Sequence, residues 1–360
     1  MITVVFILLL MQTESFAGED WEVRTQIPPK RMAFATAVVD HKVYLIGGTI
    51  YEKAKRDKGI FGPLGIQTVE VYDTQTNTWQ RVADIPTPRH AAKAAVVNGT
   101  IYVFGGSHGE ANALLRKHPV NVEAYNPRTN TWIQKQDMPV SRVDFDLGVA
   151  DGKIYVIGGS IRHNGESVNR VDVYNPATDT WVKGREMPTP RSSLSVAAVG
   201  NRIYAIGGLV WRPRAHFGLT VIEEYDATNR QWREKGDMLD TRDWFKTVVV
   251  RDSIYLIGGS IWKGVGFARE YLASVNVYDP QKDAWSDIPS LPIPFTPQGA
   301  AVVNGRIYVF GGTGDIGKGW ELFPDVVVYD TGFRAVEANG KLSTRWGELK
   351  AEPQRQYQRH

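Results

Sequence analysis

The chain of 360 residues contains no cysteine. Without a thiol it can form no disulfide, no thiolate zinc site and no cysteine nucleophile. Histidine is sparse, with 7 residues, and no two of them show the short spacing that binds a metal ion. Neither sign of charge dominates, because the formal net charge is only +3. We therefore expect no metal, no other cofactor and no nucleic-acid partner.

Long apolar runs are also missing, except near the amino terminus. Residues 2–11 are nearly all apolar, but this run is too short to cross a bilayer as a helix. Ser15 and Ala17 flank Phe16 in the small-x-small pattern that signal peptidase cleaves. We expect a signal peptide over 1–17 and a mature chain that is secreted or periplasmic, with no membrane insertion. Because no Lys or Arg precedes the apolar run, a buried N-terminal strand is the alternative.

The feature that is present throughout is an apolar run ended by two glycines. Residues 154–159 form one copy, and an uninterrupted apolar run suits a strand that is buried on both faces. Two consecutive glycines then permit a positive φ or a close backbone approach where the strand ends. The glycine pair recurs six times, at 47–48, 105–106, 158–159, 207–208, 258–259 and 311–312.

Each glycine pair is followed by further elements at constant spacing. A short segment ends in Tyr and a Trp follows seven residues later, as with Tyr174 and Trp181. Ten residues after that Trp comes an Arg, as with Arg191, and then a new apolar segment. Turn formers separate the segments, so each unit has four strands: a after Arg, b ending in Gly-Gly, c ending in Tyr and d starting at Trp. Such a unit repeated six times is the sequence signature of a β-propeller.

These motifs resemble the kelch repeat family. The resemblance rests on six Gly-Gly pairs and five Tyr-x6-Trp pairs and covers residues 21–330. It implies an all-β, six-bladed β-propeller of four-stranded antiparallel blades over 18–330, in which Tyr and Trp pack between neighbouring blades. Residues 331–360 form a tail outside the repeat, and we expect its polar end to be disordered.

The amino terminus of the mature chain predicts how the ring closes. Trp21 lies ten residues before Arg31, as Trp79 lies ten residues before Arg89. The N-terminal segment is therefore a strand d without strands a to c before it, whereas the sixth unit lacks a Trp at the expected place. We predict that the N-terminal strand completes the last blade, which removes a free sheet edge. The alternative is Trp346, which lies farther from the preceding Tyr than the repeat requires.

One face of the propeller is expected to carry the variable loops. Because strands alternate in direction, the b–c and d–a loops share one face, which we call the top face. The b–c loops are long and unlike one another, and variable loops on a regular scaffold are where repeat proteins bind. In these loops Trp211 and Trp262 suit stacking on a sugar or anchoring a partner, and burial against the next blade's loop is the alternative. The same loops carry His108, His163 and His216, which we interpret as surface residues.

The top face also receives the start of each innermost strand a. The second and fourth positions after the repeated Arg carry charge and one Trp where packing would favour small apolar residues. These groups suit a polar ligand at the channel mouth, and a water-filled channel lined by ion pairs is the alternative. The repeated Arg itself is either a ligand contact or a structural residue that bonds loop carbonyls. The ligand-binding candidates are Arg89, His90, Lys93, Arg142, Asp144, Asp146, Arg191, Arg242, Trp244, Lys246, Trp211 and Trp262.

Two classes of function fit these residues. The first is a monomeric, secreted or periplasmic binding module that holds a protein or glycan on the top face. It is favoured because no nucleophile elbow, phosphate loop or metal motif is present.

The second class is an enzyme, because propellers similar to kelch include galactose oxidase and a sialic-acid mutarotase. The copper-radical chemistry of galactose oxidase needs a Cys bonded to Tyr, and this chain has no Cys. A mutarotase-like activity would need only acid–base groups at the mouth, for which Lys93, Arg142, Asp144 and Asp146 are candidates. A deep pocket with converging charges would favour the enzyme, and a flat apolar rim would favour a partner.

Overall fold

The computed structural model describes residues 20–50, 65–107, 120–161, 165–212, 215–263, 269–315 and 320–333. The predicted signal peptide, most of the tail with Trp346, and the loop histidines His108 and His163 lie outside the described residues. Among the described ranges, no helix has the length and apolar character that crossing a bilayer requires.

Six four-stranded antiparallel sheets, numbered here as blades, contain most of the strands. Blades 1 to 3 consist of β2 (Ala35–Val39), β3 (Lys42–Ile46), β4 (Val69–Asp73), β5 (Thr78–Val82); β6 (Lys93–Val97), β7 (Thr100–Phe104), β8 (Val122–Asn126), β9 (Thr131–Lys135); and β10 (Asp146–Ala150), β11 (Lys153–Ile157), β12 (Val171–Asn175), β13 (Thr180–Lys183). Blades 4 to 6 consist of β14 (Ser195–Val199), β15 (Arg202–Ile206), β18 (Ile222–Asp226), β19 (Gln231–Glu234); β20 (Lys246–Val250), β21 (Ser253–Ile257), β24 (Val275–Asp279), β25 (Ala284–Ile288); and β26 (Thr296–Val303), β27 (Arg306–Asp315), β28 (Trp320–Asp330), β1 (Trp21–Gln26).

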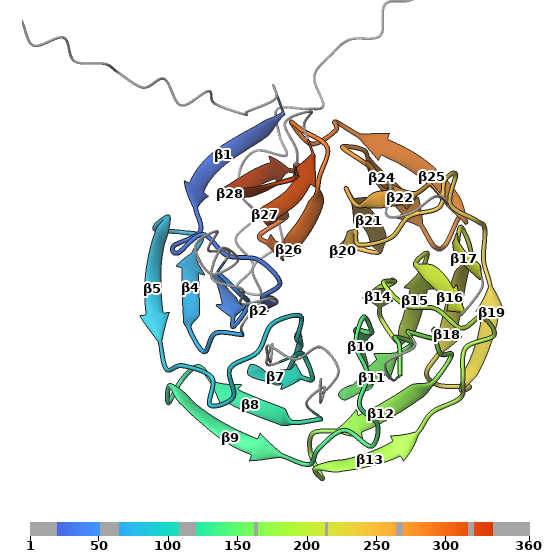
Figure 1. Ribbon diagram of the computed structural model, residues 1–360, viewed down its shortest axis with the longest axis horizontal. Helices are drawn as coiled ribbons and strands as arrows, with labels where there is room; N and C mark the ends of the chain where they lie inside the picture. Colours follow the sequence, from blue (N-terminus) through green and yellow to red (C-terminus); the bar gives the residue numbers. More distant parts are fainter. Residues whose placement is uncertain are drawn as a thin grey trace, which may run out of the picture.

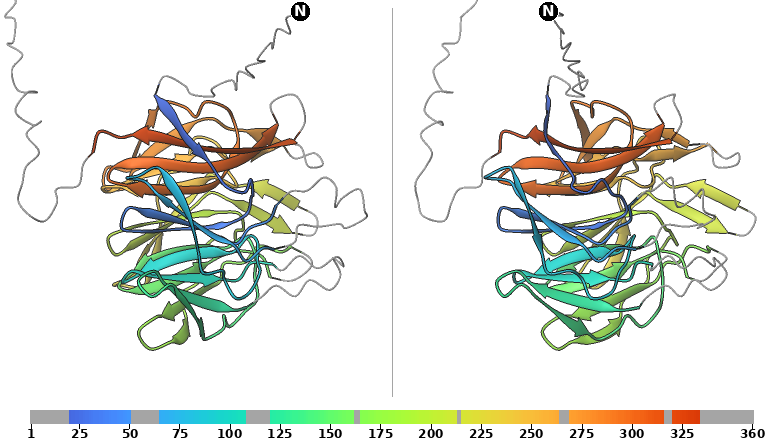
Figure 2. Two further views of the ribbon diagram at one scale, coloured as in Figure 1. Left: turned by 90° about the vertical axis from the view of Figure 1, so that its left-hand side faces the viewer. Right: turned by 60° about the vertical axis from the view of Figure 1, so that its left-hand side comes forward.

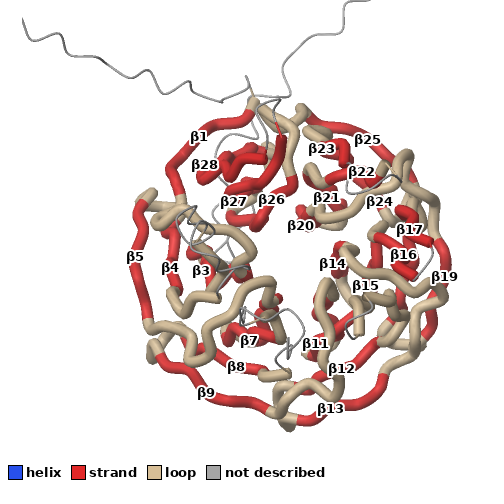
Figure 3. Tube along the Cα trace, viewed as in Figure 1, coloured by secondary structure: helices blue, strands red, loops and turns tan. Residues whose placement is uncertain are grey.

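The blades stand around a central axis, with strand a of each blade innermost and strand d outermost (Figures 1 and 3). Each innermost strand contacts the innermost strands of both neighbouring blades, from β2 around to β26 and back to β2. Two small hairpins extend b–c loops, β16 (Leu209–Arg212) with β17 (Ala215–Gly218) and β22 (Ser260–Trp262) with β23 (Arg269–Tyr271). Figure 2 shows the first of these hairpins projecting from one face of the disc. The predicted six-bladed propeller is confirmed.

The N-terminal strand closes the ring, as predicted. β1 pairs antiparallel with β28, and Trp21 stands opposite Tyr329. The Trp21 side chain is buried, and its indole N–H donates to the carbonyl oxygen of Pro289 in the neighbouring blade at 3.0 Å. The last blade therefore joins the two ends of the described chain and leaves no unpaired edge on β28.

The double glycines are required because neighbouring blades approach each other there. Gly48 has φ 96° and donates its N–H to the carbonyl oxygen of Arg89, at the start of the next blade, at 2.8 Å. A Cβ on Gly47 would lie 2.5 Å from the same carbonyl oxygen. Glycine alone combines a positive φ with so short an approach.

The repeated Tyr and Trp join the blades in a second place. Tyr174 and Trp181 lie on adjacent strands with ring centroids 5.0 Å apart, and Phe104 of the preceding blade contacts both rings. The Trp181 indole donates to the carbonyl oxygen of Gln136 in that preceding blade at 3.0 Å. The same indole-to-carbonyl bond recurs from Trp132 to Ala83 and from Trp232 to Arg185. The Trp residues thus pack between blades as expected, although their outer edges remain half-exposed.

Candidate functional site

The repeated arginines lie inside the blades. The side chains of Arg89, Arg142 and Arg191 are buried, and each donates to the carbonyl oxygen of the first glycine of its own blade's pair. Their second partner is the second residue of strand c, where Arg89 pairs with Glu123, Arg142 with Asp172 and Arg191 with Glu223. A buried guanidinium needs such a partner, because an uncompensated charge inside a protein is costly.

Blades 1 and 5 also bind their repeated arginine through the second residue of strand c, which is acidic in blade 1 and neutral in blade 5. Arg31 pairs with Glu70 in blade 1, and Arg242 bonds to the amide oxygen of Asn276 in blade 5. Burial lowers the pKa of the Arg242 guanidinium to about 10, so it remains charged at neutral pH. The four candidate arginines therefore hold the blades together, and none of them lines the central pocket. The sequence analysis missed their strand c partners, which the column of acidic residues before the repeated Tyr could have revealed.

The central pocket opens at the channel mouth on the top face and has a volume of about 550 Å³. The second residue after each repeated Arg lies at its rim and adopts a left-handed conformation, with φ between 52° and 55°. These residues are Ala33, Ala91, Asp144, Ser193 and Trp244. At the rim, blades 1 and 2 each carry an alanine, whereas blades 3 to 5 carry larger side chains. The residues of both sequence columns line this pocket.

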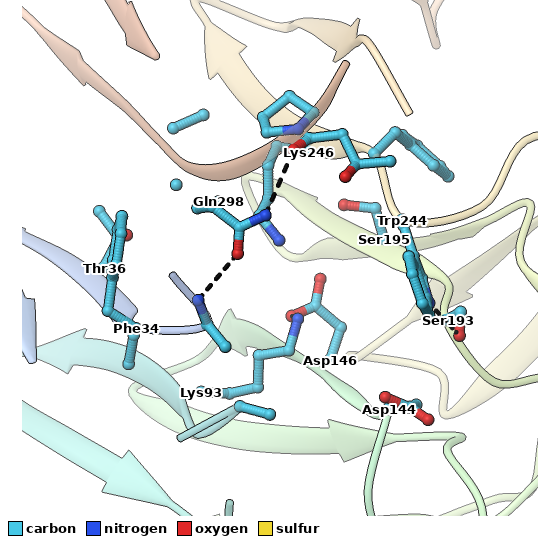
Figure 4. Close-up of a pocket in the computed structure, with 18 of the residues that line it drawn as sticks. Phe34, Thr36, Lys93, Asp144, Asp146, Ser193, Ser195, Trp244, Lys246 and Gln298 are labelled. Atoms are coloured by element: carbon cyan, nitrogen blue, oxygen red, sulfur yellow. Dashed lines mark hydrogen bonds and ion pairs between the residues drawn. The ribbon is translucent and has the colours of Figure 1, made fainter. Parts of the chain in front are cut away.

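Asp146 joins three blades within this pocket. Its Oδ1 accepts the ammonium of Lys93 from blade 2 at 3.1 Å, and its Oδ2 accepts the backbone N–H of Val196 from blade 4 at 2.9 Å. Both carboxylate oxygens are therefore engaged, and the Lys93 and Asp146 side chains meet within the pocket (Figure 4). Asp146 acts at least as a link between innermost strands, as the ion-pair interpretation expected.

Lys246 lines the same pocket and is half-buried. Within the described part of the chain, the Lys246 side chain forms no hydrogen bond and no ion pair, whereas Lys93 pairs with Asp146. Enclosure by the pocket walls, together with the nearby Lys93 and against the attraction of Asp146, lowers the pKa of the Lys246 ammonium to about 7. A pKa lowered to this extent makes the neutral amine of Lys246 far more abundant near neutral pH than that of an exposed lysine.

Asp144 of blade 3 and Trp244 of blade 5 lie at the pocket rim on either side of Ser193 of blade 4 (Figure 4). Enclosure raises the pKa of the Asp144 carboxyl, against the attraction of Lys93 and Arg269, although the side chain remains open to water at the mouth. Trp244 is 48% exposed, and its indole N–H donates to the Ser193 hydroxyl at 2.9 Å. Trp244 shares its left-handed backbone with the other rim residues, so the repeat imposes this conformation, although a bulky side chain there is uncommon.

Arg269 supports Trp244 from outside the pocket, and the sequence analysis did not find it. Its guanidinium lies 4.2 Å from the Trp244 ring centroid and 5.1 Å from that of Trp262. The buried carboxylate of Asp243 pairs with the same guanidinium. Arg269 sits on β23 in a variable loop, so no repeat column could have revealed this contact.

The chain matches two descriptions of known families. The KLHDC2/KLHL20/DRC7 Kelch-repeats domain matches residues 5–208, and the Kelch motif matches residues 190–239, 245–292 and 294–335. The chain belongs to the kelch-repeat family.

Relatives of this kelch chain include larger proteins. Kelch-like protein 36 of Rattus norvegicus is 27% identical over 275 residues, which are 76% of this chain and 42% of that protein. Kelch-like protein 35 of Mus musculus is 24% identical over 312 residues, or 87% of this chain and 39% of that protein. The kelch chain thus spans about two fifths of the length of these relatives. A solved structure titled "Structure of YjhT" has a TM-score of 0.68 at 19% identity, covers 87% of this chain and 97% of that one, and shows the same fold.

The loop tryptophans of the kelch propeller pack on each other rather than on the pocket. Trp211 stacks on His216 with ring centroids 3.7 Å apart, and Trp262 meets both rings edge-on at 6.3 Å. This cluster joins the b–c loops of blades 4 and 5, in agreement with the alternative of burial against the next loop. His90 lies outside the pocket, where its backbone bridges to Ser107.

Proposed function

We propose that this kelch propeller is an extracytoplasmic binding module whose channel mouth takes a polar group presented by a protein or glycan partner. The observation that carries the proposal is Trp244, a half-exposed ring held in a left-handed conformation at the pocket rim. Arg269 covers one side of that ring, and the pocket-facing side is free to stack on a ligand.

The charges below the ring support the same proposal. Lys93 and Asp146 form an ion pair in the pocket wall, and Lys246 lies nearby without such a partner. A ligand with hydroxyl, amide or carboxylate groups could bond to these side chains while an apolar face rests on Trp244. The family of the chain favours a protein partner, because the kelch fold typically serves as a protein-binding module. The stacking ring favours a glycan.

The test begins with a glycan array and a pull-down on the purified mature protein, followed by variants measured against each hit. Trp244→Ala introduces alanine, the residue that blades 1 and 2 carry at the equivalent rim position. Asp146→Ala removes the carboxylate that bonds to Lys93 and to the Val196 N–H. Asp146→Ala should weaken binding roughly ten- to hundredfold, the range for losing a hydrogen bond to a charged group. Trp244→Ala should weaken it about tenfold through the lost stacking surface.

The control is His41→Ala, at an a–b turn on the opposite face, where His41 contacts only the surface carboxylate of Asp73 among its charged neighbours. This change should leave affinity unaltered. If Trp244→Ala and Asp146→Ala lower the melting temperature but not affinity, the mouth is a structural channel and the proposal is wrong.

A second candidate, a mutarotase-type carbohydrate enzyme, is favoured by the pocket itself, which is concave and brings acid and base groups together rather than forming a flat apolar rim. Asp144 suits proton transfer, because its raised pKa brings it closer to neutral pH. Anomer exchange of N-acetylneuraminic acid, followed by NMR, would test this candidate. Wild-type protein should accelerate the exchange and Asp144→Asn should not.

A further inference from the structure

Lys246 and Lys93 are the two cations of the central pocket, and among the described residues Lys93 pairs with Asp146 whereas Lys246 forms no ion pair. The nearest acid on the innermost strands, Asp146, already binds Lys93 through one oxygen and the Val196 N–H through the other. Asp144 also lines the pocket, where it feels the charges of Lys93 and Arg269, and Arg269 itself pairs with Asp243.

The neutral acceptors around Lys246 are engaged as well. The Ser195 hydroxyl on β14 and the Thr247 hydroxyl on β20 bond to each other at 2.9 Å. On β26, the Gln298 side chain accepts from the Ala33 N–H at 2.8 Å and donates to the Thr296 carbonyl oxygen at 3.3 Å. An ammonium in an enclosed site with a second ammonium nearby and no ion-pair partner loses its proton readily, and a neutral lysine amine is a nucleophile.

We propose that Lys246 is a reactive amine and that the central pocket takes small polar aldehydes or ketones, which it binds as imines. The pocket has room for such a molecule, and its wall offers hydroxyl and amide groups to a hydroxylated one. This inference deepens the proposed function, since it names a ligand class for the same mouth.

The reaction balances without an oxidant or reductant. The Nζ lone pair of Lys246 adds to the carbonyl carbon, and a proton moves from nitrogen to oxygen to give a carbinolamine. The nitrogen lone pair then expels the hydroxyl group, which leaves as water after protonation by solvent at the open mouth. The product is a protonated imine.

The experiment is reductive labelling of the full protein with glyceraldehyde and sodium cyanoborohydride, mapped by peptide mass spectrometry. Lys282 is the internal control, because its ammonium is 79% exposed and pairs with Asp279. At pH 7 we expect Lys246 to be labelled at least about tenfold faster than Lys282, because far more of it is neutral. Lys93→Met should slow the labelling of Lys246 at pH 7, because it removes the neighbouring cation and frees Asp146.

Equal labelling of Lys246 and Lys282 at pH 7, in protein with native circular dichroism, would overturn the inference. So would labelling of Lys246 that is indifferent to Lys93→Met. Lys246→Arg, which keeps the charge but has no nucleophilic amine, should abolish the label on that peptide. Because the assay needs no partner, its failure leaves the effects of Trp244→Ala on partner binding independently measurable.

Discussion

Phe295 and Val327 pack in one apolar cluster between blades 5 and 6, at the two positions where the other blades place an arginine and its polar partner. In blade 4 the same positions hold Arg191 and Glu223, which form a buried ion pair at 2.8 Å. The chain thus contains its own comparison between a charged and an apolar solution to one packing problem. Replacing a buried ion pair by apolar groups of similar volume is often neutral, whereas breaking it is costly.

The first prediction follows from this comparison. Glu223→Val alone should cost about 3–5 kcal/mol of unfolding free energy, because it leaves the Arg191 charge buried without its partner. Arg191→Phe combined with Glu223→Val should lose clearly less than the sum of the two single changes. Chemical denaturation of the four proteins in this double-mutant cycle measures the difference. Strict additivity would mean that the pair does not act as a unit.

Trp181→Ala should destabilise the protein through lost packing against Tyr174 and Phe104 and a lost hydrogen bond to Gln136. We expect about 2–3 kcal/mol, below the 3–5 kcal/mol of a fully buried aromatic, because the ring edge is exposed. Thermal unfolding measures the effect, with exposed Val182→Ala on the adjacent position as the control. Equal melting temperatures for both variants would contradict the packing between blades.

Deleting residues 18–30 should destabilise or aggregate the protein. The deletion removes β1 and exposes the edge of β28, which could then pair with another chain. Deleting 351–360 should have little effect on the melting temperature. Light scattering and thermal unfolding of both truncations test the point, and similar behaviour would mean that the pairing of β1 does not stabilise the ring.

Lys246 should make stability depend on pH. Its folded pKa of about 7 lies below the ordinary value of 10.5, so between these values the unfolded chain binds more protons and stability rises with pH. Lys246→Met should therefore exceed wild type in melting temperature most below pH 7, and this advantage should shrink as the pH approaches 10. Lys282→Met, at an exposed site, should show no such trend. A constant difference between Lys246→Met and wild type across this range would mean that the folded pKa is not lowered.

Export remains a prediction from the sequence. Residues 1–17 should be removed, so that intact mass measurement of the secreted protein gives a chain beginning at Gly18. Detection of Met1 in the exported protein would contradict the signal peptide.

Much of the architecture could be predicted because it repeats. Each blade must bury the same strand faces and bring its backbone to the same close approach, so Gly-Gly, Tyr and Trp recur at constant spacing. The last blade lacks only its own strand d. The Trp at position 21, at the spacing of a strand d, was therefore enough to predict which segment completes it. The rim residues were predictable for the same reason, since equal spacing from the repeated Arg places Asp144, Ser193 and Trp244 at equivalent points.

Side-chain partners between blades had to come from the tertiary structure. The repeat spacing predicts Arg191 beside the mouth. Its side chain instead points into the blade, because the Glu223 carboxylate and carbonyl oxygens at the strand ends bind it there. Asp146 binds Lys93 and Val196 on two other blades, and Arg269 reaches Trp244 from a loop of irregular length. These contacts join positions whose sequence separation follows no repeat. Only the closed ring brings them within bonding distance, and it thereby decides that Asp146 pairs with Lys93 and, among the described residues, leaves Lys246 without an ion pair.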